Sequence, residues 1–185
     1  MDGKHTSEQW LQTIAEKNRG QLRIYFGAVA GVGKTYSMLS AAHKVHAEGK
    51  NVLIGCVETH KRQDTEAQIG ELPILPAKQY DFRGHFLPEF DIDAAIQAKP
   101  DLLLVDELAH SNVQGSRHSK RWQDIEEILA NGIDVWTTLN VQHLESLNDV
   151  VCNITGIDIN ETVPDAFFQS ADEIILVDIT AEELL

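Results

Sequence analysis

Short segments rich in apolar and β-branched residues recur along the chain at lengths typical of β-strands. Polar positions are rare within them, which indicates strands buried on both faces and therefore a mostly parallel sheet. The predicted strands are Leu22–Phe26, Asn51–Val57, Leu102–Val105, Asp134–Leu139 and Glu173–Asp178.

Between and before these strands, apolar residues repeat at helical spacing in segments that often end at glycine or proline. The predicted helices are Ser7–Lys17, Lys34–Ala47, Thr65–Leu72, Asp91–Lys99, Gln123–Ala130 and Leu144–Ile154. Alternating strands and helices predict an α/β fold of three layers, with helices on both faces of the sheet. We expect residues 1–19 to form a helical extension that packs on a single domain at 20–185.

The strongly acidic composition limits the classes of partner that this domain can bind. The formal net charge is -14, from 29 acidic and 15 basic residues, so nucleic acid and anionic membrane surfaces are poor partners. No segment approaches the ~20 apolar residues needed to cross a bilayer, and we expect a soluble chain. The two cysteines, Cys56 and Cys152, lie far apart and lack the spacing of a zinc site or a disulfide framework.

A glycine-rich turn joins the first predicted strand to the following helix, and residues 27–35 read GAVAGVGKT. This is the setting that a phosphate-binding P-loop requires. Gly31, Val32 and Gly33 would turn backbone N–H groups toward phosphates, at the positive end of the helix dipole. Lys34 would neutralise the β- and γ-phosphates, and the Thr35 hydroxyl would bind Mg²⁺. The predicted ligand is Mg-ATP.

One position departs from the strict P-loop pattern. Ala28 stands where the first glycine is expected, and Gly27 comes one residue earlier. Because alanine has the smallest side chain after glycine, we expect the loop to tolerate it. The alternative is a glycine-rich turn that binds nothing, but its place between strand and helix favours the phosphate loop. The expected fold class is therefore a P-loop NTPase-like α/β fold.

An acidic pair, Asp106 and Glu107, ends the unbroken apolar strand Leu102–Val105. Asp106 would hold Mg²⁺ through water, as a Walker B carboxylate does. Glu107 is placed where a general base could polarise a water, although both acids could simply solvate the strand end. Because the predicted strand Asn51–Val57 intervenes between the P-loop and this one, the chain is similar to the P-loop branch in which such a glutamate is catalytic.

Residues that follow other strands are further candidates, since ligands bind at the carboxyl ends of parallel strands. Glu58, Thr59 and His60 are candidates by their place after the second predicted strand. Thr138 and Asn140 could sense the γ-phosphate or orient water. Arg117, Lys120 and Arg121 form a basic stretch that could reach phosphates from a mobile loop or a neighbouring subunit. A solvated loop or a salt bridge to the acidic surface is an equal alternative for these arginines.

Several stretches together resemble the N-terminal cytoplasmic domain of the KdpD family of osmosensitive potassium sensor kinases, from about Gly20 to Leu185. They are GAVAGVGKT from Gly27, VETH from Val57, VDELAHSN from Val105, GSRHSKR from Gly115 and TTLNVQHLESLND from Thr137. Departures are small: Ala30, Gln114 and Ser119 replace prolines that the family usually has, and Lys61 replaces a common glycine.

The resemblance implies that this domain precedes a universal-stress-protein-like module, four membrane helices and a histidine kinase core that phosphorylates a response regulator of potassium uptake. No segment here resembles a phospho-acceptor histidine box or a kinase ATP lid, so the nucleotide would regulate the sensor. The expected parent lies in a bacterial inner (plasma) membrane with this domain in the cytoplasm. Since the chain ends just beyond a predicted strand, we expect the natural protein to continue past Leu185.

The leading hypothesis is thus a regulatory Mg-ATP-binding domain of a two-component potassium or osmotic sensor, with slow or absent hydrolysis. The alternative is an enzyme, either an ATPase driven by Glu107 or a small-molecule kinase of thymidine-kinase-like architecture. A third hypothesis is that the acidic surface and the loop at 110–120 chiefly make protein contacts, with nucleotide as a switch. The expected partners are ATP, the remaining sensor domains and their response regulator, with a homodimer also conceivable.

Overall fold

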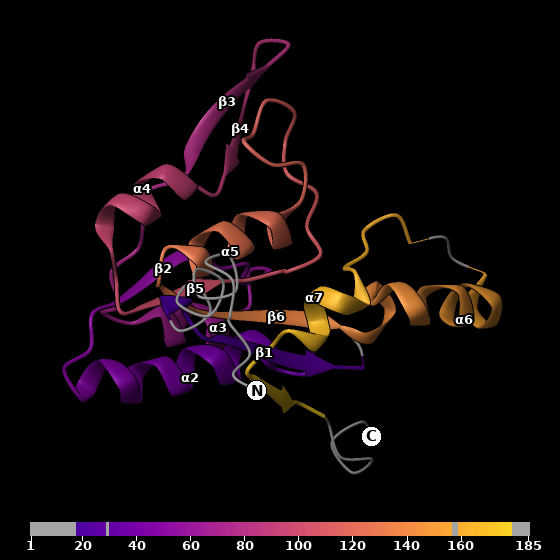
Figure 1. The fold of residues 1–185 in the computed structure, drawn as a ribbon, viewed down its shortest axis with the longest axis horizontal. Helices are drawn as coiled ribbons and strands as arrows, with labels where there is room; N and C mark the ends of the chain where they lie inside the picture. Colours follow the sequence, from indigo (N-terminus) through magenta and orange to yellow (C-terminus); the bar gives the residue numbers. More distant parts are fainter. Residues whose placement is uncertain (1–17, 29, 157–158, 179–185) are drawn as a thin grey trace, which may run out of the picture.

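A five-stranded parallel sheet forms the centre of the computed structural model, which describes residues 18–28, 30–156 and 159–178 (Figure 1). The strand order is β2-β5-β6-β1-β7, and every neighbouring pair is parallel. The strands are β1 (Leu22–Gly27), β2 (Val52–Cys56), β5 (Leu102–Val105), β6 (Asp134–Asn140) and β7 (Glu173–Leu176). Each overlaps a predicted strand, and the predicted parallel sheet is confirmed.

Helices cover both faces of this sheet, which confirms the three predicted layers (Figure 1). On one face lie α2 (Lys34–Ala47) and α3 (Gln63–Ile69), and on the other lie α4 (Ile92–Ala98), α5 (Arg121–Ala130) and α7 (Asp165–Gln169). The turn η1 (Val141–His143) and helix α6 (Glu145–Thr155) follow β6. The short helix α7 was not predicted.

Strand β5 explains why the sheet is buried on both sides. All of its residues are buried. Leu103 and Val105 pack into the core beneath α4 and α5, whereas Leu102 and Leu104 pack into the core beneath α2. Because side chains alternate between faces, an unbroken apolar run supplies both cores at once.

The sheet order corrects one step of the sequence interpretation. Strand β1 leads into the glycine-rich loop, and β5 ends in the acidic pair. The strand between them is β6. Strand β2, the predicted Asn51–Val57, follows β1 in sequence but lies at the sheet edge beyond β5. A strand does intervene, as expected, but it comes from later in the chain, because parallel crossovers need not place successive strands side by side.

A β-hairpin that the sequence did not reveal stands away from the main sheet (Figure 1). Its antiparallel strands are β3 (Lys78–Phe82) and β4 (His85–Glu89). Most of its residues are exposed, and Pro88 interrupts the apolar pattern of β4. The hairpin therefore lacks the buried apolar run that identified the other strands.

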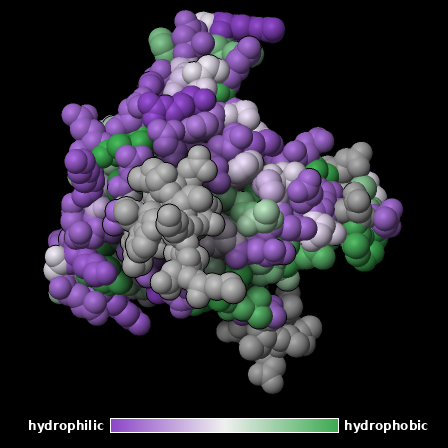
Figure 2. Space-filling model, viewed as in Figure 1, coloured by the Kyte–Doolittle hydropathy of each residue, from purple (hydrophilic) through white to green (hydrophobic). Residues whose placement is uncertain are grey.

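The face of the molecule in Figure 2 is largely hydrophilic, as expected for a net charge of -14. Apolar side chains gather on α6, where Val150 and Ile154 are exposed. Within the described ranges, no helix combines the length and apolar character needed to cross a membrane. The predicted helix Ser7–Lys17 lies outside the described residues.

Candidate functional site

The glycine-rich turn opens as a loop between the end of β1 and the start of α2. Gly31 and Gly33 both have φ of 93°, in the left-handed region that side chains disfavour. At Gly27, a Cβ atom would meet the Val177 carbonyl oxygen at 2.7 Å, so glycine is required there as well. The N-cap of α2 is Gly33, which has no side chain to accept hydrogen bonds from the first backbone N–H groups of the helix.

Lys34 is the first residue of α2, and its side chain is buried under the loop. Burial lowers the pKa of its ammonium group; the charge of Asp106 opposes this, and that of Arg62 adds to it. Val32 is also buried, so it can offer a ligand only its backbone N–H. A buried cation beside uncapped amides is suited to hold an anion.

Asp106 follows the end of β5 and accepts hydrogen bonds from several segments of the chain. Its carboxylate accepts hydrogen bonds from the Thr35 hydroxyl at 3.0 Å and the Thr138 hydroxyl. It also accepts hydrogen bonds from the backbone N–H groups of Glu58 and Glu107, each at 3.1 Å. These contacts hold one carboxylate rigidly beside the glycine-rich loop.

The pair Thr35 and Asp106 meets the requirements of a magnesium site. A hydroxyl oxygen and a carboxylate oxygen lie 3.0 Å apart, next to the N-terminus of α2. Mg²⁺ prefers oxygen ligands and usually takes few from the protein, with phosphate and water completing the shell. The residues present therefore fit the cation.

Glu107 lies beside Asp106 in a strained backbone conformation, with φ of 57°. Its side chain is 43% exposed, and its Oε1 lies 3.6 Å from Nε2 of His60. Partial burial, followed by the charge of Asp106, raises the pKa of Glu107. Strained backbone and a raised carboxyl pKa together are features of functional sites.

An open pocket brings most of the predicted residues together, with about 760 Å³ of space out to its mouth. It is lined by the predicted residues Gly31, Gly33, Lys34, Thr35, Asp106, Glu107, Thr138 and Asn140. These residues come from the ends of β1, β5 and β6 and the start of α2. Their convergence from separate segments is what the sheet topology imposes at this edge.

Arg117 and Arg121 do not line this pocket, and their predicted contact with phosphates gains no support. Arg121 is buried, where it donates to the Asp106 carbonyl at 3.0 Å and to Glu89 Oε1 at 2.8 Å. Arg117 forms ion pairs with Asp93 and Glu127. The salt-bridge alternative describes both arginines, because an acidic chain offers carboxylates close to each of them.

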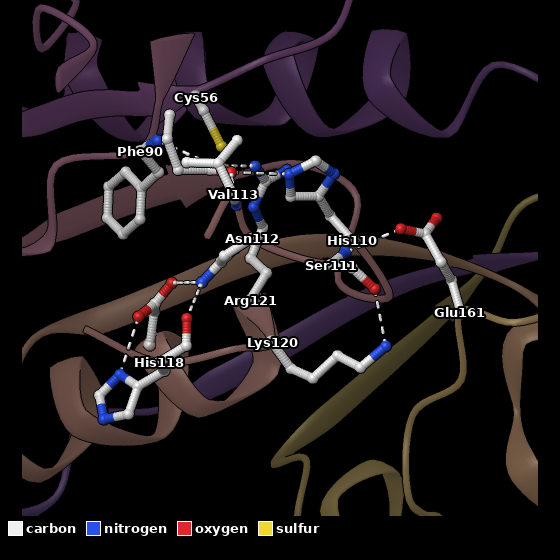
Figure 3. A network of polar contacts seen from close by, with 12 residues as sticks. Cys56, Phe90, His110, Ser111, Asn112, Val113, His118, Lys120, Arg121 and Glu161 are labelled. Atoms are coloured by element: carbon white, nitrogen blue, oxygen red, sulfur yellow. Dashed lines mark hydrogen bonds and ion pairs between the residues drawn. The ribbon is translucent and has the colours of Figure 1, made fainter. Parts of the chain in front are cut away.

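The loop that carries these arginines is cross-linked by polar contacts, shown in Figure 3. Ser111 accepts a hydrogen bond from Lys120 Nζ at 2.7 Å, and its backbone N–H donates to Glu161. Asp124 holds Asn112 and His118 at 2.6 and 2.8 Å. These contacts tie much of the segment to the fold, although Asn112 Oδ1 and Ser116 Oγ have no hydrogen-bond partner among the described residues. The prediction that its basic residues reach phosphates gains no support from them.

Two residues of the pocket that sequence reasoning passed over or ranked low are Arg62 and His60. A Cβ atom on Gly31 would lie 2.9 Å from Nη2 of Arg62, so the guanidinium lies against the glycine-rich loop. His60 was a candidate only by its place after β2. Arg62 lies farther along, just before α3, and nothing local in the sequence distinguishes it from other exposed arginines.

A family model described as "Osmosensitive K+ channel His kinase sensor domain", KdpD, matches residues 18–185. The chain belongs to the KdpD family. Among its relatives, Sensor protein KdpD of Escherichia coli (strain K12) is 55% identical over 96% of this chain and 20% of that protein. Sensor protein KdpD of Clostridium acetobutylicum is 55% identical over 91% of this chain and 19% of that protein. The predicted family resemblance is confirmed.

A third KdpD relative, from Mycobacterium tuberculosis (strain ATCC 25618 / H37Rv), is 48% identical over 97% of this chain and 21% of its own length. The chain thus spans about a fifth of the length of these KdpD proteins. Among solved structures, the ATPase DotB of Legionella pneumophila matches with a TM-score of 0.41 and 19% identity, over 84% of this chain and 39% of that chain. So low a score carries no argument about function.

Proposed function

We propose that this KdpD domain is a regulatory Mg-ATP-binding module of a two-component potassium or osmotic sensor kinase. The observation that supports it best is the meeting of the glycine loop, Lys34, Thr35 and Asp106 in one pocket. An uncapped helix N-terminus, a buried ammonium group and a rigid carboxylate are the parts a triphosphate site needs.

Each group has a distinct task in this proposal. The backbone N–H groups from Gly31 to Gly33 cradle the phosphates, and Lys34 reaches the β- and γ-phosphates. Thr35 and Asp106 hold Mg²⁺, which when bound neutralises charge on the phosphate oxygens. Thr138 fixes the Asp106 carboxylate, and Asn140 faces the same pocket.

A regulatory role is favoured by the family. The matching model is described as a sensor domain, and relatives named sensor proteins are about five times as long as the chain. We infer that nucleotide binding here biases the remaining domains of such a protein and, through them, its response regulator. The parent would lie in a bacterial plasma membrane with this domain on the cytoplasmic side, as a monomer or a homodimer.

Thermal unfolding with and without Mg-ATP tests the proposal. At 100 times the Kd, the ligand should stabilise the fold by ~2.7 kcal/mol. For a chain of this size, that corresponds to a rise in Tm of roughly 5 to 11 °C. Lys34→Ala should abolish the rise, whereas Lys50→Ala, an exposed residue beyond the C-terminal end of α2, should keep it. An unchanged Tm in the wild type, or an equal rise in Lys34→Ala, would overturn the proposal.

A second candidate is an enzyme that uses Glu107 as a base, either an ATPase or a small-molecule kinase. Two observations favour it: the strained Glu107 in contact with His60, and a second hollow of about 590 Å³ that shares Glu58, Asp106 and Glu107 with the first. A kinase needs such an adjoining space for an acceptor. An ATPase needs only water there.

Phosphate release distinguishes the binding module from the ATPase. Turnover by an ATPase should fall on the order of a hundredfold or more in Glu107→Gln, as for removal of a general base. Glu107 must be ionised to act as a base, and its pKa is raised above the ordinary value of 4.5. The ATPase activity should therefore decline with falling pH while the pH is still above 4.5. If the wild type and Glu107→Gln released phosphate equally and very slowly, the regulatory binding module would remain the proposed function.

A further inference from the structure

Arg62 occupies the rim of the phosphate loop without an ion-pair partner among the described residues. Its Nη2 and Nη1 atoms lie 2.9 and 3.3 Å from where a Cβ on Gly31 would be, so the guanidinium covers that glycine. Four other arginines in the described part of the chain, Arg19, Arg23, Arg117 and Arg121, each pair with a carboxylate. Arg83 also has no carboxylate partner among these residues, but it lies over the Phe82 ring on the hairpin. In a protein of net charge -14, the unpaired guanidinium of Arg62 differs by its place beside a phosphate loop.

The residues before Arg62 form a tight turn that is hydrogen-bonded to the pocket residue Asp106. Glu58 donates its backbone N–H to the Asp106 carboxylate, and the Arg62 backbone N–H donates to the Thr59 carbonyl at 3.0 Å. Between them, His60 and Lys61 have φ of 50° and 59°. Such strain persists only where the surrounding structure imposes it, and strained turns concentrate at ligand sites.

Helix α3, which begins directly after Arg62, is itself held against α2. The Gln68 side chain donates to the Tyr36 hydroxyl at 3.3 Å, and the Gln68 carbonyl lies 2.7 Å from Nε2 of His43. Tyr36 and His43 belong to α2, the helix that begins at Lys34. Arg62 is therefore positioned relative to the phosphate loop from both ends of its segment.

The place of the guanidinium within the pocket indicates which phosphate it would meet. Arg62 and Lys34 line the same pocket. Burial lowers the pKa of the Lys34 ammonium group, the charge of Asp106 opposes this, and the charge of Arg62 adds to it. Lys34 reaches the β- and γ-phosphates in a P-loop, so Arg62 lies toward that end of a nucleotide. A planar guanidinium can donate two parallel hydrogen bonds to phosphate oxygens.

We propose that Arg62 binds the terminal phosphate of a nucleoside triphosphate from within the same chain and so makes the site prefer triphosphate to diphosphate. This inference rests on the proposed nucleotide binding and assigns to Arg62 the role that sequence reasoning gave to Arg117 and Arg121. An arginine supplied in cis acts on the γ-phosphate in other P-loop proteins, from different positions.

Affinities of Mg-ATP and Mg-ADP, measured by calorimetry, test the proposal. Arg62→Ala should weaken ATP binding by about 10- to 100-fold, because this is the contribution of hydrogen bonds to a charged group. It should weaken ADP binding by less than about threefold. Arg62→Lys should recover only part of the loss, because an ammonium group cannot form the paired contact. Arg83→Ala is the matched control, since it removes the same charge from the hairpin, where Arg83 lies over the Phe82 ring.

The outcomes separate this proposal from the one it rests on. If the wild type binds ATP and Arg62→Ala binds both nucleotides like the wild type, or loses both equally, the role of Arg62 is overturned and the binding module stands. If the wild type binds neither nucleotide, the proposed function itself fails. Arg62 is exposed, so its variants should fold, and Tm without nucleotide checks this.

Discussion

Individual residues at this site carry strain that their neighbours maintain. His60, Lys61 and Glu107 all have positive φ, and all belong to segments that follow a strand at the pocket edge. In the left-handed region, a Cβ atom crowds the backbone, and each such residue costs on the order of 1 kcal/mol or more. Lys61 has φ of 59°, a conformation that glycine adopts without this cost.

Lys61→Gly should therefore stabilise the domain. We expect the free energy of unfolding to rise by roughly 0.5 to 1 kcal/mol, because relief of the strain exceeds the entropic cost of glycine. Urea unfolding measures this. Lys61→Ala is the control, since it removes the same charge but keeps the Cβ atom. Equal midpoints for the two variants would show that the backbone conformation at Lys61 costs nothing.

At the scale of elements, strand β6 connects the core to the site. Its register aligns Thr137 with Ile24 and Thr138 with Tyr25 of β1, and both threonines are buried. On one face, the Thr138 hydroxyl bonds to the Asp106 carboxylate. On the other, the Thr137 hydroxyl has no hydrogen-bond partner among the described residues. Thr137 and Thr138 therefore differ in their hydrogen bonding although they are adjacent in sequence, because successive side chains of a strand point to opposite faces of the sheet.

Valine at each of these positions should have opposite effects. Thr137→Val removes a buried unpaired hydroxyl and should stabilise the fold by up to about 1 kcal/mol. Thr138→Val removes a bond to a carboxylate and should cost on the order of 2 kcal/mol. Paired denaturation curves compare the two. If Thr137→Val were the more destabilising variant, the register of β6 would be wrong, since a shift of one residue exchanges the faces.

For the whole molecule, the buried Arg121 joins parts that are far apart in sequence. It links Glu89 of the hairpin to the end of β5, from its own place at the start of α5. Burial by itself would raise the pKa of Glu89. Hydrogen bonds from His110 and the Phe90 backbone, together with the charge of Arg121, outweigh burial and bring the pKa to about 2. The hairpin is thus tied electrostatically to the strand that carries Asp106.

Acid should weaken the fold through Glu89. Its pKa is lowered from 4.5 to about 2, so its contribution is complete above pH 4.5 and is lost as pH falls toward 2. The loss should be on the order of 3 kcal/mol. In Glu89→Gln, the free energy of unfolding should vary less over this range, as urea denaturation at each pH would measure.

Glu89→Gln also leaves Arg121 buried without its countercharge, so that variant should be less stable at neutral pH. The double variant Glu89→Gln, Arg121→Met removes both charges and should recover part of the loss. A pH dependence in either variant as steep as that of the wild type would contradict the assignment to Glu89.

Much of the site could be predicted because its main parts are contiguous or follow a strand. The glycine loop and the acidic pair are local patterns whose neighbours in sequence dictate their geometry. Arg121 could not be assigned from sequence, because its partner Glu89 lies on a hairpin without an apolar signature. Arg62 was missed for the same reason, since only the fold brings it to Gly31.

The sequence by itself determined the α/β layers, the glycine-rich loop before α2 and membership of the KdpD family. Backbone conformation at glycine, helix initiation and strand burial depend on residues close together in the chain. The tertiary structure alone decided that β6 separates β1 from β5, that Arg121 is a buried ion-pair partner, and that Arg62 faces the loop. Charge pairing acts through space, so strand order and register determine which of many carboxylates and cations meet.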